Sequence, residues 1–164
     1  MLDLGGTGFE WTGNYLVSGE LVNQGLLRLT TTVNSRGARD GATLRNEGTL
    51  RWEDEGNFFL LGGARVENAA AFEHIGSGGS LTFSSGSGLF VNESTGTLSK
   101  TGEGTFTITA PSENQGTLSV SNGTLRLTGA SQQNDVDVSV AAGAELAFAA
   151  RLTLIGTISG APEG

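Results

Sequence analysis

The residues of this chain that could carry out acid–base chemistry are few and lie close together. His74 is the single histidine, and it directly follows Glu73. A carboxylate and an imidazole within hydrogen-bond reach can transfer protons. Neighbouring residues of a strand, however, point to opposite faces of the sheet. We therefore expect the two side chains to be separated, and His74 to pack at the edge of the core or at a corner.

Two acidic stretches could bind a metal ion. Trp52-Glu-Asp-Glu55 is the densest acidic run, and Asp135 and Asp137 would share one face of a strand. Ca²⁺ needs about 6–8 oxygen ligands. The Gly-Gly-x-Gly-x-Asp repeat of calcium-binding β-rolls does not occur in the sequence. Asp135 and Asp137 are therefore weak metal candidates, and solvated turns are the preferred interpretation.

Other catalytic motifs are incomplete. Residues 76–81 and 86–88 are rich in glycine, but neither Gly-Lys-Ser/Thr nor a helix start follows, as a phosphate-binding loop requires. No Gly-x-Ser-x-Gly elbow precedes a helix. We predict that the chain is not an enzyme, has no catalytic residue and uses no cofactor.

A fixed sequence period must position all of these residues. Asparagine recurs at intervals of 23, 22, 24 and 22 residues, as Asn23, Asn46, Asn68, Asn92 and Asn114. A period of about 20–50 residues indicates a repeat architecture in which one supersecondary unit stacks on its copies.

Each period divides into short apolar segments separated by Gly, Ser or Asn. In segments 57–61, 80–84, 104–109 and 123–128, apolar and polar residues alternate, as in half-buried strands. Apolar residues also lie two before and four after most of the asparagines. These expected inward positions are Leu21, Leu27, Leu44, Leu50, Val66, Phe72, Phe90 and Leu118. In the fourth period Leu98 comes two residues late, which predicts an insertion at Ser94-Thr95.

We interpret the five asparagines as a structural ladder at one corner of a coil. Each side-chain amide has a donor and an acceptor and can bond to its copy in the next coil. Asparagine and glycine both tolerate a left-handed backbone. We expect that conformation at the asparagines and at the glycine two residues later (Gly25, Gly48 and Gly116).

The pattern predicts an all-β parallel β-helix (β-solenoid). We expect about seven coils of 22–24 residues, with three short strands per coil, in one domain covering residues 1–164. An antiparallel sandwich is the alternative. It is less favoured because a sandwich does not repeat one motif at a constant period and prefers two-residue hairpin loops.

Outward positions should form ladders of their own. Arg28, Arg51 and Glu73 lie five residues after their asparagines, with Ser99 and Ser119 at the equivalent places. Strands in a sheet are about 4.8 Å apart, so we expect Arg51 and Glu73 to pair, which contributes about 0–1 kcal/mol. Threonine rows occur at 30–32 and 105–109, and we expect them not to recur in register.

Charge and composition limit the partners. The net charge is −8, which argues against nucleic acid and against an anionic membrane surface, and there is no cysteine. No apolar run approaches the roughly 20 residues of a membrane span. The start of the chain lacks the basic and apolar regions of a signal peptide. We expect a fragment of a longer exported repeat protein whose targeting segment lies elsewhere.

Residues 96–129 resemble the passenger-domain repeats of bacterial autotransporters. These repeats contain a leucine, a Lys-x-Gly-x-Gly-Thr segment and a later Gly-Thr-Leu strand. The matching positions are Leu98, Lys100, Gly102, Gly104, Thr105, Gly123, Thr124 and Leu125. The resemblance implies a right-handed β-helix at, or released from, a bacterial surface.

Three functions are consistent with these features. The leading hypothesis is a non-enzymatic structural or adhesive segment outside a bacterial cell, which binds a host or matrix glycan or protein, or associates end to end. The second is a carbohydrate-active or glycan-binding β-helix. The third is a self-assembling or ice-binding solenoid. None of the three implies binding of nucleic acid or insertion of this segment into a membrane.

Overall fold

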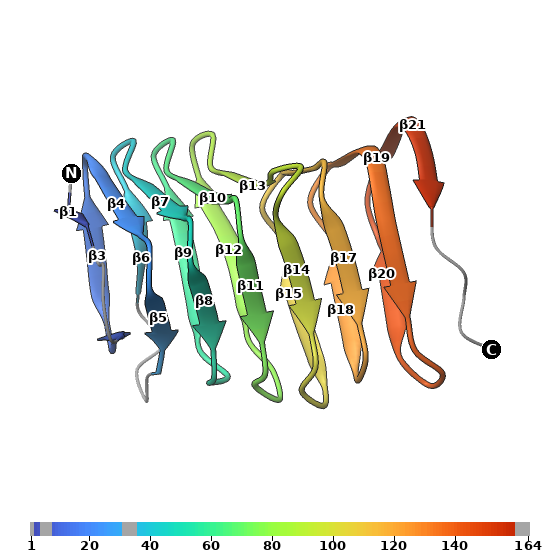
Figure 1. Cartoon of the computed structure of the whole chain (residues 1–164). Coiled ribbons are helices and arrows are strands. Elements are labelled where there is room, and N and C mark those ends of the chain that lie inside the picture. Colours follow the sequence, from blue (N-terminus) through green and yellow to red (C-terminus); the bar gives the residue numbers. More distant parts are fainter. Residues whose placement is uncertain (1, 4–7, 31–35, 160–164) are drawn as a thin grey trace.

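The computed structural model describes residues 2–3, 8–30 and 36–159, which contain β-strands and no helix. The strands follow one another round a common axis, and each strand pairs in parallel with its counterparts in neighbouring coils (Figure 1). The predicted fold class, an all-β parallel solenoid with three strands per coil, is confirmed.

Every third strand belongs to the same sheet. The first sheet contains β1 (Leu2–Asp3), β4 (Glu20–Asn23), β7 (Thr43–Asn46), β10 (Arg65–Asn68), β13 (Leu89–Asn92) and β16 (Ser112–Asn114). The second sheet contains β2 (Phe9–Trp11), β5 (Leu26–Leu29), β8 (Thr49–Trp52), β11 (Ala71–His74), β14 (Thr97–Lys100) and β17 (Thr117–Val120). The third sheet contains β3 (Asn14–Val17), β6 (Arg36–Arg39), β9 (Asn57–Leu61), β12 (Ser80–Ser85), β15 (Thr105–Ile108), β18 (Thr124–Leu127) and β20 (Glu145–Phe148).

Two longer strands end the solenoid. The ten-residue β19 (Ser131–Val140) pairs with both β16 and β17, so it continues the first and the second sheet across their common corner. The final strand, β21 (Leu152–Ser159), pairs in parallel with β19.

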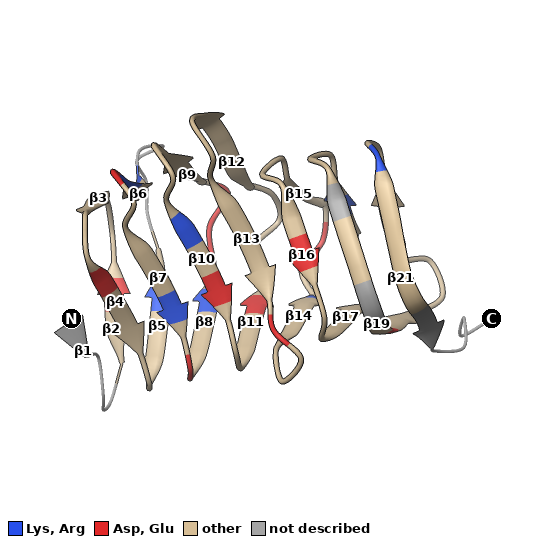
Figure 2. Cartoon of the chain, turned by 90° about the horizontal axis from the view of Figure 1, so that it is seen from above, with Lys and Arg blue, Asp and Glu red and all other residues tan. Residues whose placement is uncertain are grey.

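The coil is right-handed. In Figure 1 the second sheet faces the viewer with its strands running downwards, while the chain advances from left to right. The first sheet lies on top and the third sheet lies behind, as the view from above confirms (Figure 2). The third sheet has seven strands, so the chain passes round the axis seven times and completes about six turns.

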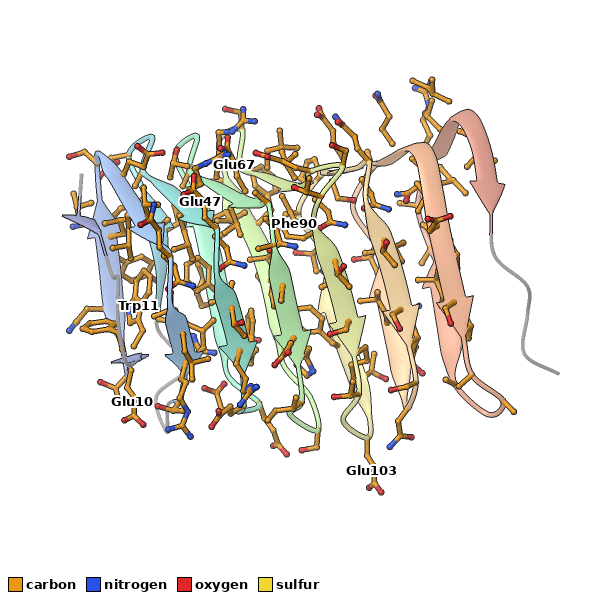
Figure 3. The ribbon with its side chains drawn as sticks, viewed as in Figure 1. Glu10, Trp11, Glu47, Glu67, Phe90 and Glu103 are labelled. Atoms are coloured by element: carbon orange, nitrogen blue, oxygen red, sulfur yellow. The ribbon has the colours of Figure 1, made fainter. Side chains whose placement is uncertain are left out.

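Alternation of side chains builds the core. Strands such as β8, β10 and β17 alternate between buried and half-buried residues, because successive side chains point into and out of the coil. The inward residues form one continuous hydrophobic core, in which Trp11 and Phe90 lie inside the coil (Figure 3). Trp52 is its centre, with ring centroids 6.2 Å from Phe72 and 5.0 Å from Phe106.

The registers of the sheets agree with the predicted inward positions and with the insertion. Phe72 pairs with Leu98, so the two extra residues at 94–95 are accommodated in the turn between β13 and β14. The last coil differs from the expected 22–24 residues, because Asn114 pairs with Gln133 only 19 residues later. The turns at 115–116 and 121–123 are shorter than their counterparts at 93–96 and 101–104, whereas the turn before β19 has the same length as the turn before β16.

The predicted left-handed backbone at the asparagine corner is wrong. None of the five asparagines, nor Gly25, Gly48 or Gly116, has a positive φ among the described residues. Glycine is needed there for space. A Cβ on Gly48 would lie 2.3 Å from the carbonyl oxygen of Gly25, and a Cβ on Gly116 would lie 2.2 Å from that of Gly96. The backbones of successive coils therefore approach too closely for a side chain.

Gly123 and Gly143 separate two reasons for a glycine, namely a positive φ and the lack of space for a Cβ. Gly123 has a φ of 65°, and a Cβ there would lie 2.3 Å from the Gly104 oxygen, whereas Gly143 has a φ of 81° and open space around it. We expect Gly143→Ala to cost about 1–2 kcal/mol through the backbone alone, and Gly123→Ala to cost more. The free energies of unfolding of the two variants, measured by chemical denaturation, would be equal if coil stacking at Gly123 did not matter.

Candidate functional site

The five asparagines of the sequence period form one buried column at the corner between the first and second sheets. Each side-chain amide Nδ2 donates to the Oδ1 of the next asparagine, at distances of 2.7, 2.7, 2.7 and 2.6 Å from Asn23 to Asn114. Asn114 in turn donates to Gln133 Oε1 at 3.0 Å. All six side chains are buried. The column holds the coils to one another and is closed to ligands.

The same side-chain amides also donate hydrogen bonds to backbone carbonyl oxygens at the corner. Asn46 Nδ2 donates to the carbonyl oxygen of Ala71 at 2.8 Å, and Asn68 Nδ2 donates to that of Thr97 at 3.1 Å. These carbonyls lie where the chain has turned into the second sheet of the next coil. A buried carbonyl without a donor is costly, so one amide per coil stabilises both the stacking and the turn.

A second set of polar side chains lies inside the opposite corner, between the second and third sheets. It contains Arg36, Trp52, His74 and Lys100, which are all buried, together with the half-buried Asp54. We call these five residues the interior polar stack. Three of its members lie in one column, since Trp52 pairs with His74 and His74 with Lys100 across neighbouring strands.

His74 is buried between rings and separated from Glu73. Its ring lies 4.1 Å from that of Phe106, centroid to centroid, and Nε2–H donates to the Gly78 carbonyl oxygen at 2.7 Å. The other ring nitrogen, Nδ1, is buried without a hydrogen bond. Burial, together with the nearby Lys100 ammonium, lowers the pKa of His74 to about 4, although the hydrogen bond to Gly78 acts in the opposite direction. The imidazole is therefore neutral near pH 7.

Lys100 is a buried ammonium held by the backbone. Its Nζ donates to the carbonyl oxygens of Gly102, of Glu103 at 2.9 Å and of Gly76 at 3.3 Å. Burial lowers the pKa of Lys100. The arrangement gives a physical reason for the Lys-x-Gly-x-Gly-Thr segment. The lysine ammonium donates hydrogen bonds to the backbone carbonyls of the corner, while Gly104 allows the chain to turn with a φ of 67°.

Arg36 and Asp54 form the charged end of the stack. Arg36 Nη1 and Nη2 donate to the two carboxylate oxygens of Asp54 at 2.6 and 2.9 Å. The guanidinium carbon lies 4.8 Å from the ring centroid of Trp52. Asp54 also accepts from Trp52 Nε1 and from the Gly56 amide. The acidic run thus supplies one interior ion pair, and the sequence did not predict that Arg36 lies inside.

Of the two weak metal candidates, the structure describes the side chain of Asp137 only. Asp137 is exposed on β19, and the side chain of Asp135 lies outside the described part of the chain. Among the described residues, no group of three or more His, Cys, Asp or Glu side chains could hold a metal ion.

Outward side chains divide the surface into two halves. The N-terminal half carries ion pairs on the first and second sheets, over β7 and β10 and over β5, β8 and β11 (Figure 2). Arg51 donates to Glu73 at 2.8 Å, so the predicted pair is confirmed. Arg45 is the centre of the largest network, at 2.9 Å from Glu47, 3.1 Å from Glu67 and 2.7 Å from Glu93. Glu47 and Glu67 lie together at the upper corner in Figure 3.

This network should contribute measurably because one guanidinium joins three carboxylates. We expect Arg45→Ala to lower the free energy of unfolding by about 1 kcal/mol, and Arg39→Ala, which removes one exposed ion pair and a contact 5.8 Å from the Tyr15 ring centroid, by less. The loss at Arg45 should shrink at about 1 M salt, where the Debye length is roughly 3 Å. A loss that does not depend on salt, measured by denaturation, would show that packing rather than charge is involved.

The C-terminal half presents hydroxyl groups instead. On the second sheet Thr97 pairs with Thr117 and Ser99 with Ser119, and on the third sheet Thr105 pairs with Thr124. The prediction that the Thr-x-Thr row at 105–109 does not recur in register is confirmed on β18, because Thr105 pairs with Thr124 but Thr107 pairs with Arg126. Turn lengths vary from coil to coil and obscure such pairs in the sequence. Residues 31 and 32 of the other predicted row lie outside the described residues.

A hollow of about 360 Å³ lies among these hydroxyls on the third sheet. It is lined by residues of β15, β18 and β20 and of the turn that follows, namely Thr105, Thr124, Arg126, Glu145, Ala147, Phe148 and Ala149. Another hollow, of about 290 Å³, lies at the N-terminal end beside Phe9, Trp11 and Tyr15, next to residues outside the described ranges. A further hollow, of about 400 Å³, lies over the first sheet and is lined by Leu89, Pro111, Ser112, Glu113, Ala130, Gln132, Arg151 and Thr153. The third-sheet hollow is a candidate for contact with a ligand because it adjoins the paired threonines of β15 and β18.

Comparison of the chain with protein-family models, with curated proteins and with solved structures finds no match. Within the described ranges there is also no helix long and apolar enough to cross a membrane.

Proposed function

We propose that this chain is a non-enzymatic segment of an extracellular bacterial solenoid, similar to an autotransporter passenger, which keeps its shape and displays an adhesive surface. The buried asparagine column carries this proposal. It connects the successive coils from Asn23 to Gln133 by side-chain hydrogen bonds that face no solvent. A scaffold of this kind stays rigid while its outward residues vary.

The placement of the acid–base residues also supports a binding role over a catalytic one. His74 faces the core with a lowered pKa, and Glu73 faces outward in an ion pair with Arg51. An acid–base pair needs both groups within reach of the same substrate, and these two lie on opposite faces of β11.

Adhesion and turnover can be tested side by side. Beads coated with the chain should attach to surfaces that carry host or matrix glycans and proteins, and uncoated beads should not. The same protein, incubated with a panel of polysaccharides, should release no new reducing ends and no unsaturated products. Hydrolytic or lyase turnover that is lost when one acidic residue is changed, for example in Glu145→Gln, would contradict the proposal.

A further inference from the structure

We propose that the third-sheet hollow is a binding site for a neutral glycan, approached along the hydroxyl rows of β15 and β18. The inference specifies the ligand of the proposed adhesive surface and so rests on the proposed function. The volume of about 360 Å³ is within the range of ligand sites, roughly 300–1,000 Å³.

Two charged side chains give the hollow both donors and acceptors. Arg126 is exposed and, unlike Arg28, Arg45 and Arg51, makes no ion pair with any described residue. Its guanidinium donors are therefore available to a ligand. Glu145 lies on the next strand, and its Oε2 accepts from the Thr124 hydroxyl at 3.2 Å, which orients the carboxylate. Neighbouring sugar hydroxyls both donate and accept, so a guanidinium beside a carboxylate suits them.

The charge balance favours a neutral ligand. Arg126 and Glu145 carry one formal charge of each sign, and the remaining lining residues are uncharged. An acidic glycan would meet the Glu145 carboxylate and an overall charge of −8, whereas a cationic ligand would meet the Arg126 guanidinium. A neutral sugar meets neither repulsion.

Apolar surface completes the site. Ala147 and Ala149 add small apolar side chains beside the polar groups, and the half-buried Phe148, which packs against the core, borders the hollow from the inside. Pyranose rings carry C–H groups on one face and hydroxyls at the rim, and ligand sites commonly combine apolar or aromatic walls with a few polar groups that fix orientation.

Hydroxyls extend beyond the hollow in a regular array. Thr105, Thr107 and Thr109 alternate along β15 and the residue after it, and Ser80 pairs with Thr107 on the next coil. Neighbouring strands are about 4.8 Å apart, and alternate residues of a strand about 6.6–6.8 Å. A glycan of several units can thus continue from the hollow across β15 towards β12.

The test uses immobilised neutral oligosaccharides of glucose, galactose, mannose and N-acetylglucosamine, with oligogalacturonate as the acidic probe. At least one neutral probe should bind, and Arg126→Ala, Glu145→Ala and Thr124→Val should each weaken its binding about tenfold or more, because hydrogen bonds to charged groups are lost. Thr117→Val and Arg39→Ala, outward residues away from the hollow, are the matched controls and should bind as the unchanged chain does. Circular dichroism checks that every variant keeps its strands.

Three results would overturn the inference: no neutral probe binds, binding is unchanged in all three hollow variants, or oligogalacturonate binds more tightly than every neutral probe through Arg126. Bead adhesion distinguishes this failure from failure of the proposed function. Adhesion that persists in the three variants leaves the adhesive role standing and moves its site elsewhere on the solenoid.

Discussion

Replacing Asn68 by alanine is expected to lower the free energy of unfolding by about 3 kcal/mol or more. Asn68 is the middle member of the column. It accepts from Asn46 at 2.7 Å and donates to Asn92 Oδ1 at 2.7 Å and to the Thr97 carbonyl at 3.1 Å. Alanine would leave the Asn92 oxygen and the Thr97 carbonyl without this donor, and each buried unsatisfied group costs about 1–3 kcal/mol.

An aspartate at the same position makes the test sharper. Asn68→Asp preserves the shape but places a carboxylate oxygen opposite Asn92 Oδ1, so we expect a larger loss than for alanine near pH 7. Protonation at low pH restores one O–H donor, so the stability of this variant relative to the unchanged chain should recover as the pH falls. Gln115→Ala, which removes an exposed amide beside the column, is the control and should cost less than about 0.5 kcal/mol. Chemical denaturation gives all three values, and a cost for Asn68→Ala as small as that of the control would disprove the role of the column.

The second large effect is a loss of stability in mild acid that depends on His74. Its pKa is about 4 in the folded chain and 6.5 as an ordinary value. The unfolded chain therefore binds a proton between pH 6.5 and 4 that the folded chain does not. The stability contributed by the neutral imidazole is complete above pH 6.5 and is lost as the pH is lowered from 6.5 to 4. The total loss is about 3 kcal/mol, at 1.36 kcal/mol per pKa unit.

The groups around His74 explain why it resists protonation. The Lys100 ammonium belongs to the neighbouring strand β14, and the Phe106 ring stacks on the imidazole. Asp54 attracts the proton only weakly, as the least of the contributions to the shift, and is held by Arg36. A proton on Nδ1 would have no acceptor in the folded chain, because that atom is buried without a partner.

His74→Phe isolates this effect, since the chain has no other histidine. The variant loses the hydrogen bond to Gly78 and should be less stable at pH 7, but its free energy of unfolding should change much less between pH 6.5 and 5. Lys100→Met should act differently, because removal of the ammonium lets the pKa of His74 rise. Unfolding curves at several pH values and the NMR titration of the imidazole measure both. Equal pH slopes for the unchanged chain and His74→Phe would contradict the prediction.

The sequence predicted the parts of this fold that depend on local order and period. The asparagine intervals and the alternation in segments such as 57–61 depend only on which residues face inward. Turns could lengthen by the two residues at 94–95 without disturbing that pattern. Gln133 was missed because it differs in type from the asparagines and comes after 19 residues, yet its longer amide reaches the same column.

The buried charges and the hollow were harder to predict. Lys100 lies two residues after the inward Leu98, so alternation alone could have placed it inside. Lysine is usually exposed, so a buried Lys100 was not predicted. Its burial is explained by the hydrogen bonds from its ammonium to the carbonyls of Gly76, Gly102 and Glu103. The third-sheet hollow depends on which residues of three different coils lie side by side. That register is fixed by turn lengths, which the sequence period does not determine.

The asparagine column also has an orientation. Every amide in it donates towards the C-terminal end and accepts from the N-terminal side, from Asn23 through Asn114 to Gln133. The amide dipoles therefore line up head to tail along the axis, and each polarises the next in a medium of low dielectric constant. The two ends of the rod therefore differ electrically, because the amide hydrogens point towards the C-terminal end and the amide oxygens towards the N-terminal end. A coil joining this rod would thus be recognised by its direction as well as by its shape.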